Sequence, residues 1–214
     1  MRSMSVPDPV SFLADPESKP EELLVGGARE LSALVKTLME VIDLPNKRAK
    51  NRAVKLLAGL SVTDPGALRP HRERFIELLE SEDNILLWNA LIVVGHLAAV
   101  DDDGLIAARA LRLRKFFAAE SMITTGHAIE ALGRIAFHSD KQRTKIANWL
   151  VKVGDTPHGD ECREILAGKA LGALEGVAGQ LRNKAKVKAF AEAYEKSPRS
   201  GVAKKAGKLV KKLG

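Results

Sequence analysis

Four side chains that could ligate a metal ion stand together in the segment HGDEC, at His158, Asp160, Glu161 and Cys162. Imidazole, carboxylate and thiolate groups are common metal ligands, but a four-ligand site normally combines two separate pairs along the chain. We therefore interpret the segment as a polar turn that opens a helix, where acidic side chains interact favourably with the helix dipole. We expect no metal and no cofactor.

Motifs for phosphate binding or nucleophilic catalysis are missing from the sequence. It contains no GxGxxG, no Walker loop and no GxSxG. The pair Gly26 and Gly27 is preceded by no predicted strand, so it is interpreted as a helix break and not as a phosphate loop. Cys162 is the only cysteine, which excludes an intrachain disulfide and gives no sign of an oxidising compartment.

Positive charge is concentrated at the C-terminal end of the chain. Residues 182–214 contain eleven Lys and Arg against two Glu, a net charge of +9, whereas the whole chain carries +7. The rest of the chain is therefore slightly acidic. Such a local excess is typical either of a solvated helix face or of a surface that contacts phosphates.

An octet of the form Ala-x-x-x-apolar-small-x-apolar recurs along the chain. It occurs at 53–60, 90–97, 128–135 and 167–174, and a degenerate copy begins near Ala203. The first, fifth and eighth positions share one face of an α-helix, so each octet predicts a helix with one buried stripe. The small sixth position (Ala58, Gly95, Gly133 and Gly172) predicts a close approach by a neighbouring helix, and Leu at Gly133 or Gly172 is expected to destabilise by about 1–3 kcal/mol.

A second helical stretch precedes each octet, and short breaks separate the pairs. A helix pair every 37–39 residues is typical of an array of αα-hairpins. The predicted first helices are 28–41, 71–79, 105–118, 142–153 and 185–194.

The junction FIELLESEDNILLWNALIVVGHLAA resembles a HEAT repeat: the end of one helix, an acidic turn, and a second helix with the Ala…Leu-Gly-x-Leu motif. The same junction recurs as LRKFFAAESMITTGHAIEALGRIA. The resemblance covers about residues 20–214 and departs from the pattern in the longer turn at 154–160. It implies an all-α fold, a right-handed α-α superhelix (HEAT-like solenoid) of about five helix pairs, whose second helices line a concave face that holds partners.

Two catalytic branches are built on similar arrays. The deoxyhypusine hydroxylase branch carries repeated adjacent His-Glu pairs that bind iron, and this sequence has none. The alkylbase DNA glycosylases rely on aromatic and acidic groove residues, whereas the aromatic candidates here are Trp88, Trp149 and Tyr194, with Trp149 at core spacing. We predict that the chain is not an enzyme, and keep a repeat enzyme as a distant third reading.

The octet register predicts which side chains of the second helices remain exposed. Positions −5, −1, +2 and +6 lie opposite the buried stripe. They form a ridge that is basic at first, apolar and His-bearing in the middle, and small toward the fourth octet. The residues we expect to bind a partner are Arg48, Arg52, Lys55, Asn89, Ile92, His96, His127, Glu130, Arg134 and Lys169.

The last predicted helix is amphipathic and basic. The hypothesis we favour is a terminal cap with a solvated outer side, which a solenoid requires. The alternative is a surface for non-specific nucleic-acid binding, together with Arg48, Arg52 and Lys55, since no aromatic side chains for base stacking are present there. The lysines concerned are Lys204, Lys205, Lys208, Lys211 and Lys212.

The leading hypothesis is thus a non-enzymatic scaffold that binds a protein or peptide along the ridge of its second helices. We expect residues 1–18 to be flexible and residues 19–214 to form one solenoid domain. The N-terminus lacks an apolar stretch and the longest apolar segment is too short to span a bilayer, so a soluble, cytoplasmic protein with no membrane partner is expected.

Overall fold

The computed structural model describes residues 8–24, 28–182 and 184–214, and these residues contain helices and no strand. The prediction of an all-α solenoid is confirmed. None of the described helices is long and apolar enough to cross a membrane. The structure divides into two compact units, and the boundary between them lies between Val93 and Val94.

Unit 1 comprises the described residues up to Val93, and α3 is its longest helix. Helices α1 and α2 both pack against α3. Its elements are α1 (Pro9–Ala14), the 3-10 helix η1 (Pro20–Leu24), α2 (Ala28–Val41), α3 (Lys47–Thr63), α4 (Pro65–Leu68), η2 (Arg69–His71), α5 (Arg72–Glu77), η3 (Leu78–Glu80) and most of α6 (Asn84–Leu97).

Unit 2 begins within the last turn of α6 and runs to the end of the chain. Its second helices are long, whereas its first helices are shorter and include 3-10 turns. The elements are η4 (Ala98–Val100), α7 (Leu105–Ala108), α8 (Ala110–Arg114), η5 (Lys115–Ala118), α9 (Met122–His138), α10 (Asp140–Leu150), η6 (Val153–Asp155), α11 (Asp160–Val177), η7 (Ala178–Gln180), α12 (Ala185–Ala193) and α13 (Ser200–Leu213).

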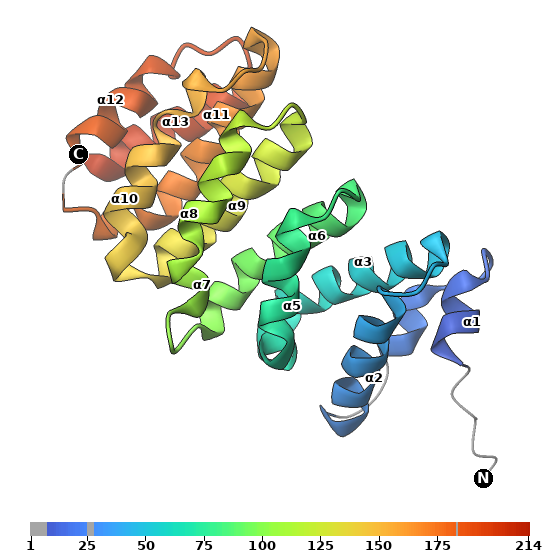
Figure 1. Ribbon diagram of the computed structural model, residues 1–214. Coiled ribbons are helices and arrows are strands. Elements are labelled where there is room, and N and C mark those ends of the chain that lie inside the picture. The colour runs from blue at the N-terminus through green and yellow to red at the C-terminus, as the bar shows by residue number, and fades with distance from the viewer. Residues whose placement is uncertain (1–7, 25–27, 183) are drawn as a thin grey trace. The chain divides into compact units, whose positions relative to one another are not determined.

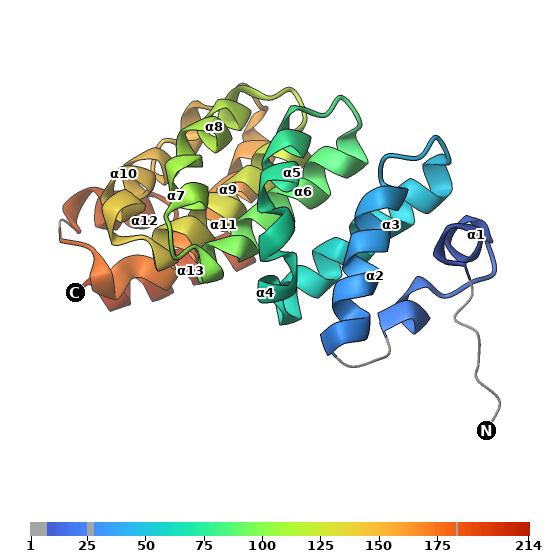
Figure 2. The ribbon, with the colours of Figure 1, turned by 60° about the horizontal axis from the view of Figure 1, so that its bottom comes forward.

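The helices of unit 2 form two layers (Figures 1 and 2). Helices α9, α11 and α13 lie side by side in one layer, with α11 packed against both neighbours. Helices α8, α10 and α12 form the other layer, and α10 contacts both α8 and α12. Each helix has one apolar stripe, and packing the two layers against each other buries these stripes. The core of unit 2 therefore lies between the layers.

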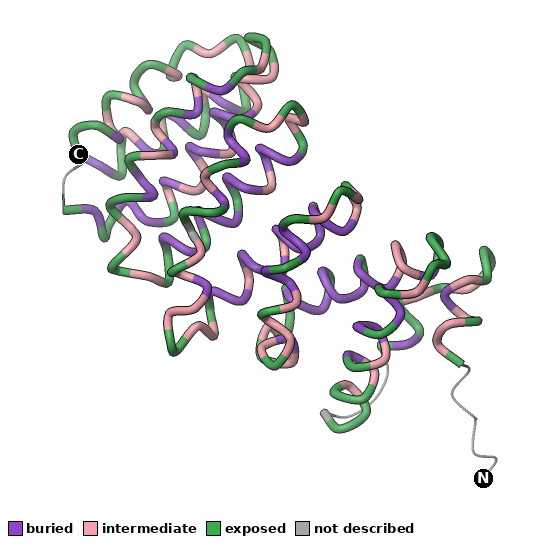
Figure 3. Tube along the Cα trace, in the orientation of Figure 1, coloured by how far each residue is buried: buried purple, intermediate pink, exposed green. Residues whose placement is uncertain are grey.

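The buried stripe of the octets is confirmed by the burial of its side chains. The four leading alanines, Ala53, Ala90, Ala128 and Ala167, are all 0% exposed. The apolar residues four and seven positions later are buried as well. In Figure 3 these buried stretches run along the second helices on the sides that face the neighbouring layer. The period read from the sequence therefore identifies the core.

The fifth octet begins one residue earlier than predicted. Val202, Ala206 and Leu209 are buried, whereas Ala203 is half-buried. The octet is thus VAKKAGKL, with Gly207 at the small position, so the register is kept and Ala203 does not lead it. The prediction was one residue off because this octet begins with Val202, whereas the other four octets begin with Ala.

The close helix approach predicted at the small position is confirmed at two glycines. A Cβ added at Gly133 of α9 would lie 2.5 Å from the Cβ of Ala173 in α11. A Cβ added at Gly95 would lie 2.9 Å from the Cα of Ala131 in α9. Real Cβ atoms do not approach other carbons so closely, so any larger residue would push the helices apart.

At Gly172 the prediction of close packing is wrong. An added Cβ would meet only the Nζ of Lys205, at the ordinary contact distance of 3.8 Å. Gly172 occupies the same octet position as Gly133, but no backbone or Cβ atom of a neighbouring helix comes within 4 Å of a Cβ added there. The octet pattern alone does not distinguish the two situations.

The N-terminal segment differs from the predicted flexible stretch of residues 1–18. Residues 1–7 lie outside the described residues, but residues 9–14 form α1, whose Leu13 is 0% exposed. The guanidinium of Arg52 then donates to four backbone carbonyls, those of Leu13, Asp15, Pro16 and Ser18, and to the Ser18 hydroxyl. The sequence did not predict α1 because a helix this short shows no period, and the flexibility of residues 1–18 stays a prediction. The single domain over 19–214 stays a prediction.

We predict that Gly133→Ala and Gly172→Ala change stability in opposite directions. The first must separate α9 from α11, at a cost of about 1–3 kcal/mol that outweighs the gain in helix propensity. The second meets no close atom and keeps the propensity gain of up to about 1 kcal/mol. Urea unfolding followed by circular dichroism measures both. Destabilisation by Gly172→Ala would show that neighbouring side chains pack more closely around Gly172 than the 3.8 Å contact indicates.

We also predict that Arg52→Ala releases the N-terminal segment. The substitution leaves several backbone carbonyls of the segment without their donor, so amide hydrogen exchange over residues 8–24 should accelerate by at least about tenfold. Lys55→Ala, on the same helix and exposed, is the control and should leave that exchange unchanged. Equal protection in both variants would mean that α1 packing alone holds the segment.

Candidate functional site

In unit 1 the predicted ridge residues are placed in different environments. Arg48 and Lys55 are exposed, and Ile92 is half-buried. Asn89 is only 8% exposed and its side-chain amide donates to the carbonyl of Ile85 at 2.7 Å. Arg52 is engaged by the N-terminal segment, as described above. The described residues of unit 1 therefore present a discontinuous ridge.

In unit 2 the ridge residues come together along three successive second helices. Two clefts, of about 490 Å³ and about 630 Å³, open on α9, α11 and α13, and both are lined by Glu130, Lys169 and Lys205. We call this continuous surface the α9–α11–α13 groove. Besides the three shared residues, the first cleft is lined by Gly133, Arg134, Phe137, His138, Gly172, Ala173 and Gly176.

Small residues form the floor of the first cleft. Gly133 and Ala173 mark the close approach of α9 to α11, and Gly172 and Gly176 follow on the exposed side of α11. A Cβ at Gly176 would have no atom within 4 Å, and at Gly172 only the Lys205 ammonium. These positions carry no side chains that could fill the cleft.

A single aromatic side chain lines the first cleft. Phe137, in the last turn of α9, is 47% exposed, and its ring meets the imidazole of His138 edge-on at 4.9 Å between centroids. An exposed phenyl ring beside a polar cleft is a candidate contact for an apolar group of a ligand. The predicted ridge did not include Phe137, although this residue lies three positions beyond Arg134 and so extends the same helical face by one turn.

The groove carries more positive than negative charge. Lys169 of α11 forms an ion pair with Glu130 of α9, and the Nδ1 atom of His127 lies 3.8 Å from the other oxygen of that carboxylate. Lys205 donates to the carbonyl of Gly168 at 3.0 Å. Within the described chain, no carboxylate pairs with Lys205 or with Arg134. After Lys169 pairs with Glu130, the positive charges of Arg134 and Lys205 have no carboxylate partner among the described residues.

Three histidines border this surface, and all have lowered pKa values. Burial is the first cause for the imidazoles of His96, His127 and His138, since it disfavours the charged form. The positive charge of Arg134 lowers the pKa of His96 and of His138 further. The lowered pKa values favour the neutral imidazole over the cation in all three side chains.

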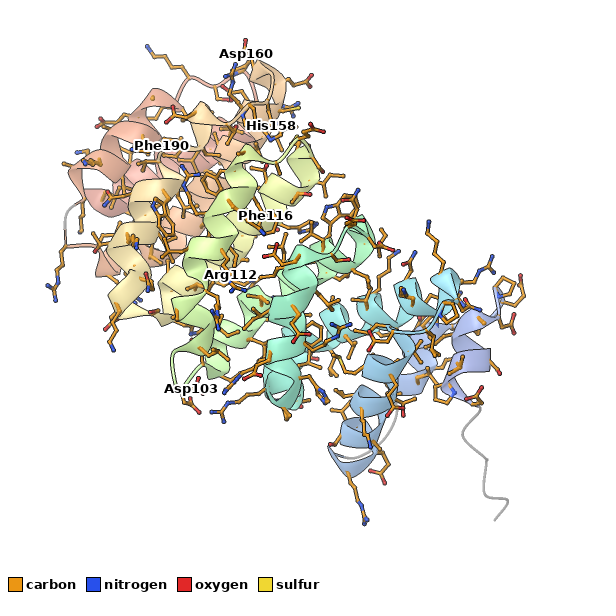
Figure 4. All side chains as sticks on the ribbon, in the orientation of Figure 1. Asp103, Arg112, Phe116, His158, Asp160 and Phe190 are labelled. Carbon is orange, nitrogen blue, oxygen red and sulfur yellow. The ribbon has the colours of Figure 1, made fainter. Side chains whose placement is uncertain are left out.

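The side chains of the HGDEC segment do not converge. The Nε2 atom of His158 lies 3.1 Å from the hydroxyl of Thr125, whereas Asp160 and Glu161 each form an ion pair with a nearby arginine. Figure 4 shows His158 and Asp160 at the loop that leads into α11. Among the residues whose placement is described, no three His, Cys, Asp or Glu side chains are arranged to hold a metal ion.

The C-terminal lysines divide between two sides of α13. Lys205 and Lys212 lie against α11, where their ammonium groups donate to the carbonyls of Gly168 and Glu175. Lys204, Lys208 and Lys211 are exposed. The apolar face, formed by Val202, Ala206, Leu209 and Leu213, is buried. The helix therefore has the amphipathic character expected of a terminal helix, and Lys205 belongs to the groove.

The fold defines a class of protein, the armadillo/HEAT-like helical repeats. No family model and no curated protein matches the sequence. The structure is similar to a designed armadillo repeat protein with a TM-score of 0.63 and 21% identity, over 98% of this chain and 100% of that one. A designed armadillo repeat protein in complex with the peptide (KR)4 gives a TM-score of 0.65 and 19% identity, over 96% and 98% of the two chains.

A third similar structure is one of a set of computationally designed armadillo repeat proteins for modular peptide recognition. Its TM-score is 0.62 at 20% identity, and the match covers 98% of this chain and all of the designed chain. At such identities the likeness establishes the fold: helix pairs in an armadillo-type repeat, extending over almost the whole sequence. It is silent on what this chain binds.

We predict that the three histidines titrate below their ordinary pKa in the folded protein. Because their folded pKa is lowered, the stability they contribute is complete above the ordinary value of about 6.5 and is lost as the pH falls through the folded values. An NMR titration of the imidazole protons in buffer and in urea measures both states. Folded midpoints at or above those in urea would contradict the burial described here.

Proposed function

We propose that this chain is a non-enzymatic helical-repeat scaffold that binds a peptide along the α9–α11–α13 groove. The observation that carries the proposal is the groove itself: one surface that crosses three successive second helices and whose floor is made of glycine and alanine. Catalysis has no comparable support, because the groove offers a lysine–glutamate pair and neutral histidines but no nucleophile activated by a base.

The dimensions of the surface suit an extended chain. Packed helices lie about 8–10 Å apart, so three of them present a surface about 20 Å across. An extended peptide rises about 3.3 Å per residue, and about six residues would cross the three helices. Polar groups on both sides of the floor, at Glu130, Arg134 and Lys205, are available to the peptide backbone and side chains.

Similar structures supply a second line of support. Two of them are described as peptide-recognising designs, and one of these is in complex with a peptide. The proposal is confined to unit 2, because in unit 1 Arg52 is occupied and Asn89 is buried. Partner binding by Arg48, Lys55 and Ile92 stays a prediction, as does nucleic-acid binding by the C-terminal lysines.

We predict that Gly172→Leu abolishes peptide binding without unfolding the protein. The new side chain extends from the floor of the cleft, where its Cβ meets only the Lys205 ammonium at 3.8 Å, so it removes contact area for the ligand without displacing a buried residue. A phage-displayed library of random peptides is selected against the wild type, and fluorescence anisotropy then measures each selected peptide against the variant. The expected loss of affinity is at least about tenfold.

The matched control is Gly59→Leu, at an exposed position inside α3 where an added Cβ meets no atom within 4 Å. It makes the same chemical change in unit 1 and should leave peptide affinity as in the wild type. If the library yields no peptide that distinguishes the two variants, the groove is not a peptide-binding site. Tight binding of duplex DNA to the wild type, lost in Gly172→Leu, would instead favour nucleic acid.

A further inference from the structure

We infer that the peptide bound in the α9–α11–α13 groove is acidic, with carboxylates that pair with Arg134 and Lys205 and an apolar side chain that contacts Phe137. The inference rests on the proposed function and names the class of partner. Three features of the described residues support it. The groove has more cations than carboxylates, and Phe137 lines the first cleft. In unit 1, Arg52 of α3 donates to backbone carbonyls of an acidic segment.

The charge balance excludes a basic ligand on electrostatic grounds. The first cleft presents the cations Arg134, Lys169 and Lys205 against the single carboxylate of Glu130, and that carboxylate is already paired with Lys169. A peptide of alternating Lys and Arg would bring further positive charge to Arg134 and Lys205 and would have no free carboxylate to meet. Like charges placed together at an interface oppose binding and select against such partners.

Arg134 and Lys205 are positioned for a ligand and not for the core. They come from α9 and α13, the helices on either side of α11, and line the same cleft. The stem of Arg134 packs over Gly95, which leaves the guanidinium at the surface, and the single hydrogen bond of Lys205 goes to a backbone carbonyl. A carboxylate would add a charged acceptor to each of them.

Unit 1 shows how this repeat register holds an acidic segment. Residues 8–22 contain five acidic side chains and one lysine, and residues 15–18, DPES, form a turn after α1. The carbonyls of this turn accept hydrogen bonds from Arg52, a residue of the predicted ridge. An arginine of a second helix thus binds a turn of an acidic segment through its backbone. Arg134 occupies a ridge position of α9 that is open to solvent.

A peptide fits the groove better than a nucleic acid does. Glu130 lies at the centre of the surface, where it lines both clefts, and its carboxylate oxygens are acceptors for which a phosphate backbone offers no donor. A peptide has backbone N–H groups that can donate to Glu130 while its carboxylates reach the flanking cations. Lys204 and Lys211 are exposed on α13 and line neither cleft.

The inference is tested with three fluorescent peptides of equal length: alternating Asp and Glu around a central Phe, alternating Lys and Arg around the same Phe, and alternating Ser and Asn around it. Anisotropy is measured at about 0.15 M ionic strength, where exposed charges more than about 8 Å apart are screened. The acidic peptide should bind at least about tenfold more tightly than the other two. Tighter binding of the basic or the uncharged peptide would overturn the inference.

Matched charge variants locate the binding. Arg134→Gln with Lys205→Gln should weaken binding of the acidic peptide about tenfold, whereas Lys204→Gln with Lys211→Gln removes the same net charge and should change it by less than about twofold. Equal losses in both variants would mean diffuse attraction to the basic end of the chain. Phe137→Ser should weaken binding only when the peptide contains its central Phe, and an effect on a Phe-free acidic peptide would contradict that contact.

The outcomes of this experiment are distinct from those of the library selection. Library peptides that depend on Gly172 but lack acidic residues would uphold the peptide-binding function and overturn the acidic class. Acidic peptides that bind Gly172→Leu as tightly as the wild type would place their site outside the groove and overturn the inference as well. Tighter binding of duplex DNA than of the acidic peptide, lost in the Arg134 and Lys205 variant, would identify a phosphate-binding surface in its place.

Discussion

Helices α9 and α11 approach each other so closely at Gly133 that a single added methyl group would not fit, and the rest of unit 2 depends on this contact. The separation of 2.5 Å between a Cβ built there and that of Ala173 means that the Gly133 backbone packs against the Ala173 methyl group, with no side chain at position 133 between the two helices. With the spacing fixed, the leading alanines and the leucines that follow them can fill the space between the layers. The groove on the outer side inherits the same spacing, because its floor is the contact line itself.

One octet position serves two different purposes along the chain. At Gly133 the missing side chain allows packing between helices, and at Gly172 it leaves room above α11 that no protein atom fills. Glycine within a helix costs about 1 kcal/mol relative to alanine, so it persists where something offsets the cost. At Gly133 the offset is the packing of α9 on α11. At Gly172 no such packing exists within the described residues, which is why the open floor is central to the proposed function.

Arginines of the second helices illustrate how position in the fold decides the role of a residue type. Arg52 is surrounded by backbone carbonyls of the N-terminal segment, and its planar donors make it a clamp for that segment. Arg134 stands on an equivalent face of α9 but has no carboxylate partner in the described chain, and its charge is instead felt by two histidines. The same guanidinium is structural in one unit and available for a ligand in the other.

The sequence by itself determined the helical class, the repeat length and the buried stripe, because a helix must place its apolar residues at a period of about 3.6 to bury them. The ends of most predicted helices and the burial of Ala53, Ala90, Ala128 and Ala167 follow from that period. Only the tertiary structure decided what depends on distances between helices. The closeness at Gly133 and the openness at Gly172, the occupation of Arg52 and the presence of Phe137 and Lys205 on one cleft all arise between residues far apart in the chain. A period along one helix carries no information about such distances, since they depend on how neighbouring side chains fill the space between helices.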